Sequence, residues 1–127
     1  MNQEEIMQCL QAAIVLHNKG ELNQAESIYR QVLSVDADNF YALRFLGCLR
    51  SSRGDSRSAI AFLRKALTVA DSDSECWFNL GNAFKADWQL DEAVAAYRSA
   101  SERGSVNPQV FNNWGRCLQE LSKQEES

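Results

Sequence analysis

The sequence predicts an all-α protein built as a solenoid of antiparallel helix pairs. The first observation is a 34-residue period in small side chains, which places Ala13, Gly47, Gly81 and Gly115 at equal intervals. The second is the helical spacing of apolar residues within each period, and the third is a polar residue that recurs just before each apolar run. A unit of this length cannot bury its own apolar face, so it is stable only when stacked on copies of itself.

The first helix of each unit is marked by its start and by its apolar stripe. Asn39, Asp73 and Asn107 are 34 residues apart, and each can accept a backbone N–H at a helix N-terminus. Pro108 follows Asn107 at the first helical position, where its missing N–H costs little. In the third unit Trp77, Leu80, Gly81 and Phe84 follow at i, i+3, i+4 and i+7, which predicts one buried stripe.

A turn separates the two helices of each unit. Gly20 and Gly54 occupy this turn in the first two units, where the backbone adopts a left-handed conformation most easily at glycine. Trp88 takes the place in the third unit, so we expect an altered turn or an exposed aromatic ring there.

The second helices repeat a small residue followed four positions later by a large one. The small residues allow two helices to cross closely, and the large residues fill the space around the crossing. The pairs are Ala25 and Tyr29, Ala59 and Leu63, and Ala93 and Tyr97.

These patterns divide residues 1–127, a single domain, into units 6–39, 40–73 and 74–107 and a terminal helix over 108–122. In the terminal helix we expect Val110, Cys117 and Leu121 to lie where the second helix of a fourth unit would pack. In the first helix we expect Cys9, Ala12, Ala13 and Leu16 to form the packed stripe.

Composition and charge exclude several classes of partner and cofactor. The net charge is −4 and the apolar runs are short, so we expect no membrane insertion and no nucleic-acid partner, although residues 40–73 are locally basic. The four cysteines form no Cys-x-x-Cys pair and only one histidine is present, so we expect no metal and no cofactor. Cys9, Cys76 and Cys117 fall on apolar helical positions and are interpreted as reduced core residues. The N-terminus lacks the features of a secretory signal, which predicts a cytoplasmic protein.

The repeat length and the order of the residues in the third unit resemble those of the tetratricopeptide repeat family. The third-unit residues that match are Trp77, Leu80-Gly81, Phe84, Ala93, Tyr97 and Ala100. Arg50 departs from the pattern, which has an apolar or aromatic residue at this position. The resemblance implies a right-handed superhelix whose first helices line a concave groove that binds a peptide or a partner protein. The groove residues expected from the register are Tyr41, Arg44, Phe78, Asn79, Asn82, Lys85, Asn112, Asn113 and Arg116.

Asn79 and Asn113 are one period apart and resemble the asparagine ladder of relatives attached to O-linked N-acetylglucosamine transferases. They can pair with a peptide backbone, or instead bond a neighbouring helix or water. The clamp with which other relatives hold chaperone tails is absent, because Leu10, Ile14, Phe45, Glu75 and Asn79 occupy its positions.

The sequence therefore predicts a non-catalytic interaction scaffold, with two alternatives. The first is that the chain serves as the N-terminal substrate-recognition segment of a larger enzyme such as a transferase. The second is that it self-associates through an apolar strip, Met7, Leu10 and Ile14, which we expect to be exposed to solvent in a monomer. His17 and Cys48 are the one pair worth testing for catalysis, but we expect stacked helices to hold them too far apart.

Overall fold

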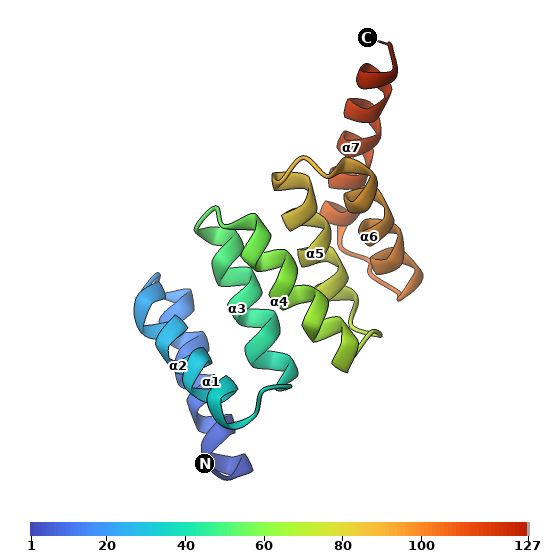
Figure 1. Cartoon of the computed structure of the whole chain (residues 1–127). Helices are drawn as coiled ribbons and strands as arrows, with labels where there is room; N and C mark the ends of the chain where they lie inside the picture. Colours follow the sequence, from blue (N-terminus) through green and yellow to red (C-terminus); the bar gives the residue numbers. More distant parts are fainter. Residues whose placement is uncertain (127) are drawn as a thin grey trace.

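The computed structural model describes residues 1–126, which form seven α-helices and no strand. Figure 1 shows the helix pairs following one another along the chain, with the last helix after them. The pairs are α1 (Gln3–Asn18) with α2 (Leu22–Val35), α3 (Phe40–Ser52) with α4 (Ser56–Val69), and α5 (Ser74–Ala86) with α6 (Leu90–Glu102), and the last helix is α7 (Pro108–Glu126). The predicted all-α solenoid of helix pairs is confirmed, and α7 continues past the predicted end at residue 122.

The predicted helix starts are confirmed by hydrogen bonds. The side-chain oxygen of Asn39 accepts from the backbone N–H of Ala42 at 3.0 Å, and that of Asp73 accepts from Cys76 at 2.7 Å. Asn107 accepts from Gln109 at 3.0 Å and α7 begins at Pro108. These bonds satisfy backbone donors that have no partner inside the helix.

The predicted close crossings lie between the two helices of a pair. A Cβ atom added to Gly47 would be 2.7 Å from Leu63 Cγ, and one added to Gly81 would be 2.7 Å from the ring of Tyr97. Leu63 and Tyr97 are fully buried. Glycine is therefore the residue that lets α3 approach α4 and α5 approach α6.

Trp88, in the turn of the third unit, has an exposed aromatic side chain, as predicted. Its φ is 58°, which is the left-handed region that Gly20 and Gly54 occupy in the preceding turns. Trp88 is 69% exposed, so burial of its side chain does little to offset the backbone strain. The turns after α1, α3 and α5 thus share this conformation, at Gly20, Gly54 and Trp88.

The buried stripe of α1 differs from the prediction. Ile6, Leu10 and Ala13 are buried, whereas Ala12 is exposed and Cys9 is half-buried. The prediction that Leu10 is exposed to solvent was wrong. Because α1 packs against α3 as well as α2, Leu10 lies in the same core cluster as Leu46.

The packing of α7 also differs from the prediction. Val110 and Cys117 are fully buried and Leu121 packs beside them, because this side of α7 rests on the preceding pair, α5 and α6. They therefore do not lie where a further helix would pack. The neighbouring face carries Phe111 and Leu118, which are about half exposed.

Arg50, the departure from the repeat pattern, links three helices. Its guanidinium lies 3.2 Å from Glu26 on α2 and 3.4 Å from Asp55, the N-cap of α4. Glu26 also pairs with Arg30 at 3.2 Å. The charged side chain replaces an apolar contact between units with an ion-pair network.

Candidate functional site

The first helices of the three pairs, α1, α3 and α5, share one face of the solenoid with α7. Three hollows lie along this face. One stripe of α5 connects them, because Glu75 and Asn79 line the second hollow and Asn82 and Ala86 line the third. These four residues follow at i, i+4, i+7 and i+11, which is a single helix face. We call this surface the groove.

The N-terminal half of the groove contains two adjoining hollows that share Ile14, Arg44 and Phe45. The first encloses about 250 Å³ between α1 and α3, and its other lining residues are Met7, Leu10, Gln11 and Tyr41. The second encloses about 430 Å³, and its other lining residues are His17, Asn18, Tyr29, Cys48, Glu75 and Asn79. The residues predicted for self-association and for peptide binding thus line the same hollow.

Arg44 is the cation between these two hollows. Its guanidinium lies 4.8 Å from the ring centroid of Phe45 and 3.8 Å from a carboxylate oxygen of Asp73. Its Nε is shielded from solvent and has no hydrogen-bond partner. A buried N–H without an acceptor is unfavourable by about 1–3 kcal/mol.

Cys48 and His17 line the second hollow but do not form an activated pair. Burial raises the pKa of the Cys48 thiol to about 11, and Glu75 adds to this rise while Arg44 opposes it. Burial lowers the pKa of His17, whose Nδ1 lies 3.4 Å from the hydroxyl of Tyr29. The thiol is therefore protonated at neutral pH, and a protonated thiol is a poor nucleophile.

The C-terminal half of the groove is one hollow of about 580 Å³ between α5 and α7. Asn82 lies at its base, where its side-chain oxygen accepts hydrogen bonds from Tyr97 at 2.7 Å and from the Asn113 amide at 2.9 Å. Lys85 of α5 and Arg116 of α7 line the same hollow, together with one carboxylate, Glu120 of α7.

The two predicted rungs of the asparagine ladder differ in their surroundings. The Asn113 amide donates to Asn82, so it fixes α7 against α5. The Asn79 side chain makes no hydrogen bond within residues 1–126, and it faces the second hollow. Only Asn79 has its full hydrogen-bonding capacity available.

Two other predicted residues lie outside the hollows. Phe78 packs against Tyr97 with ring centroids 6.3 Å apart, and Asn112 is exposed on α7. Sequence reasoning did not place Phe45 or Trp88 in the site, although both line a hollow. The signal for Trp88 was its occurrence at a turn position that otherwise holds glycine.

Within residues 1–126 no three His, Cys, Asp or Glu side chains are grouped so that they could hold a metal ion. In the same residues no helix is both long enough and apolar enough to cross a membrane.

Comparisons with known proteins agree with this geometry. Family models described as tetratricopeptide repeat match residues 6–39 and 42–76. Tetratricopeptide repeat protein 7A of Homo sapiens is 30% identical over 90 residues, which cover 71% of this chain and 10% of that protein. The chain spans between 10% and 36% of the length of the curated relatives it matches.

Solved structures show the same fold. The first repeat domain of Spaghetti (RPAP3), bound to an HSP90 peptide, superimposes with a TM-score of 0.91 at 16% identity, covering 96% of this chain and 97% of that one. A Thermobaculum terrenum O-GlcNAc transferase superimposes with a TM-score of 0.86 at 23% identity, covering 93% of this chain and 23% of that one. With its 34-residue period, its stacked helix pairs and these matches, the chain belongs to the tetratricopeptide repeat family.

Proposed function

We propose that this chain is a non-catalytic binding module that holds an extended peptide of a partner protein in the groove. Tetratricopeptide repeats are generally protein-interaction modules, and one structural neighbour holds a peptide. The observation that carries the proposal is the second hollow, which is lined by the cation Arg44 and by Asn79, whose amide makes no hydrogen bond within residues 1–126. An extended peptide supplies carbonyl acceptors and N–H donors for both.

The charge of the groove favours a peptide with an acidic or C-terminal carboxylate group at one end. Lys85 and Arg116 line the third hollow from opposite helices, and each is without an ion-pair partner among the described residues. A carboxylate between two cations forms charge-assisted hydrogen bonds, which are stronger than neutral ones. Trp88 at the edge of the same hollow offers an exposed ring for an apolar side chain of the peptide.

Two other functions remain alternatives to this proposal. The groove would serve equally as the recognition segment of a larger protein, such as a transferase, with the same residues contacting the substrate. Self-association through the N-terminal strip is less well supported, because Leu10 is 5% exposed and Ile14 is half-buried, which leaves Met7 as the exposed member.

Selection of random displayed peptides on the parent chain, followed by affinity measurements on the selected peptides, tests the groove. The variant Asn79→Ala with Arg116→Ala removes one free amide and one cation that have no structural partner among residues 1–126. We expect it to weaken binding at least about tenfold, or about 1.4 kcal/mol.

The matched control is Gln31→Ala with Arg98→Ala, which removes an amide and a cation from exposed positions on the second helices α2 and α6. We expect its affinity to stay within about twofold of the parent. Equal affinity of the parent and the groove variant, with loss in the control, would place the site on the outer helices and refute the proposal.

A further inference from the structure

The second hollow of the groove carries one uncompensated negative charge. Its cation, Arg44, is balanced by Asp73, whose carboxylate oxygen lies 3.8 Å from the guanidinium, and the Arg44 side chain is only 17% exposed. Glu75 lines the same hollow from the first turn of α5, is exposed, and forms neither a hydrogen bond nor an ion pair within residues 1–126. His17 is neutral at pH 7, because burial lowers its pKa. The charge left for a ligand in this hollow is therefore the carboxylate of Glu75.

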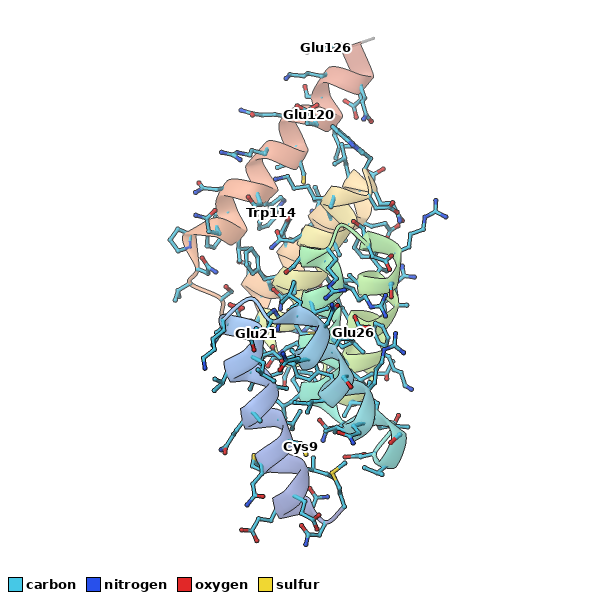
Figure 2. The ribbon with its side chains drawn as sticks, turned by 90° about the vertical axis from the view of Figure 1, so that its left-hand side faces the viewer. Cys9, Glu21, Glu26, Trp114, Glu120 and Glu126 are labelled. Carbon is cyan, nitrogen blue, oxygen red and sulfur yellow. The ribbon has the colours of Figure 1, made fainter. Side chains whose placement is uncertain are left out.

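The third hollow carries uncompensated charge of the opposite sign. Lys85 and Arg116 line it from α5 and α7, and neither forms an ion pair within the described residues. The carboxylate in this hollow, Glu120, lies further along α7 than Trp114 in Figure 2 and is 3.3 Å from the ammonium of Lys123, which balances it. The charge left for a ligand here is positive.

The face of α5 that connects the two hollows sets the distance between these charges. Glu75 and Lys85 are ten residues apart on α5, so they lie about 15 Å apart along the helix axis. An extended chain advances about 3.3 Å per residue, so this distance corresponds to about four to five residues of a bound peptide. Asn79 lies between the two charges, with its amide available to the peptide backbone.

We propose that the groove selects an extended segment of a partner protein with a basic side chain for Glu75 and, about four to five residues away, an acidic side chain for Lys85 and Arg116. This selection rests on the proposed function, since the peptide must lie in the groove before either charge is recognised. A peptide shifted along the groove, or one with both charges exchanged, brings like charges together in the hollows. Charge complementarity of this kind fixes register and excludes wrong partners more than it adds affinity. The amide of Asn79 binds any backbone, whereas the two charged hollows choose the sequence.

The test begins with the random displayed peptides selected on the parent chain. We expect one basic and one acidic position to be enriched, about four to five residues apart. One selected peptide is then synthesised with lysine or glutamate at the basic position, and titration calorimetry gives the affinity of each form. We expect the parent to bind the lysine form at least about fivefold more tightly, because glutamate replaces an attraction by a repulsion. The variant Glu75→Lys should reverse this order and bind the glutamate form more tightly.

The acidic position is tested in the same way at the other end of the groove. Lysine in place of the acid should weaken binding to the parent at least about fivefold. The variant Lys85→Glu with Arg116→Glu should prefer the lysine form instead. The proposal requires both reversals, and thermal melts establish that each variant is folded.

The matched control is Glu92→Lys, which reverses an exposed charge in the first turn of α6, outside the groove. Glu75 and Glu92 both lie near a helix N-terminus, so the two substitutions disturb the helix dipole alike. We expect Glu92→Lys to keep the parent's preference for the lysine form. A reversal in Glu92→Lys as well would assign the effect to the overall charge of the chain and overturn the proposal.

Failure of the charge selection is distinguishable from failure of the groove itself. Peptides that lose affinity with Asn79→Ala and Arg116→Ala, but lack the two enriched charges or keep their preference in Glu75→Lys, would show a groove without charge selection. Peptides that ignore all of these substitutions, or the absence of any bound peptide, would refute the proposed function together with this inference.

Discussion

Gly81 lies directly beneath the ring of Tyr97, with the position of a Cβ atom 2.7 Å from ring Cδ1 and Cε1. The ring cannot move aside, because its hydroxyl donates to Asn82 and the whole side chain is buried. We expect Gly81→Ala to destabilise the chain by about 1–2 kcal/mol, since overpacking outweighs the gain in helix propensity. Denaturant unfolding measures the difference.

The matched control for this substitution is Gly115→Ala in α7. Nothing lies within 4 Å of a Cβ atom there, so only the helix propensity changes. We expect a gain of about 0.5–1 kcal/mol. Equal effects at the two glycines would show that packing against Tyr97 does not govern position 81.

Ala59 is fully buried on α4 at the crossing with α3. We expect Ala59→Leu to cost about 1–3 kcal/mol, because three additional carbon atoms must displace the neighbouring helix. A thermal melt detects this as a lower midpoint, whereas Ala61→Leu on the exposed side of the same helix should leave the midpoint nearly unchanged. An unchanged midpoint for Ala59→Leu would mean that the crossing lies elsewhere.

Glu26 and Arg50 form a partly buried ion pair between α2 and α3, with side chains 19% and 21% exposed. We expect Glu26→Gln to destabilise the chain by about 1–2 kcal/mol, because Arg50 loses its counter-charge in a shielded position. Arg30→Gln removes the exposed partner of the same carboxylate and should change the free energy of unfolding by less than about 0.5 kcal/mol. Replacing both Glu26 and Arg50 by leucine should be nearly neutral, and a loss larger than that of Glu26→Gln alone would contradict this account.

Trp88 adopts a left-handed backbone conformation, with φ of 58°, in a position where its ring gains little burial. We expect Trp88→Gly to stabilise the chain by about 1 kcal/mol, because glycine reaches this region without steric strain. Gly54→Ala, at φ of 81° with open space around it, should be destabilising by a similar amount. If Trp88→Gly also weakens the selected peptides, the strained residue is retained for binding.

Cys76 provides a pH-dependent contribution to stability. Burial raises its pKa from 9.0 to about 12, so the folded state holds the thiol proton more tightly than the unfolded state does. The contribution is complete below pH 9 and is lost as the pH rises from 9 toward 12. We expect the parent to lose about 1 kcal/mol more than Cys76→Ala between pH 8 and pH 10, measured by urea unfolding under reducing conditions. Val110→Ala makes a comparable core cavity without a thiol and should follow the parent's pH dependence.

The sequence determined the helix pairs, their starts and the residues at which the two helices of a pair cross. Asn39, Asp73 and Asn107 cap the helices as predicted, and Gly47 and Gly81 lie at the crossings. These features depend on contacts within one unit, whose partners are close in the chain. A helical period and a cap residue are sufficient to specify such contacts.

Tertiary structure decided which side chains the next unit covers. Leu10, Arg44, Phe78 and Asn112 are 34 residues apart and share one register position, which the sequence suggested was accessible. Leu10 is buried in a cluster with α3 and Arg44 lies beside the α5 cap Asp73, so the next unit covers both, whereas Phe78 packs on Tyr97 of its own unit. Of these four residues Asn112 is the exposed one, and no further helix covers it within residues 1–126.

The same reason explains the amides and the apolar residues of α7. Asn113 bonds Asn82 across two units, whereas Asn79, one period earlier, bonds no described residue. Val110 and Cys117 are buried by the preceding pair, and Phe111 and Leu118, on the neighbouring face, remain exposed. A helical stripe fixes which residues share a face, but the angle at which neighbouring units stack decides which faces meet, and that angle is a property of the assembled helices.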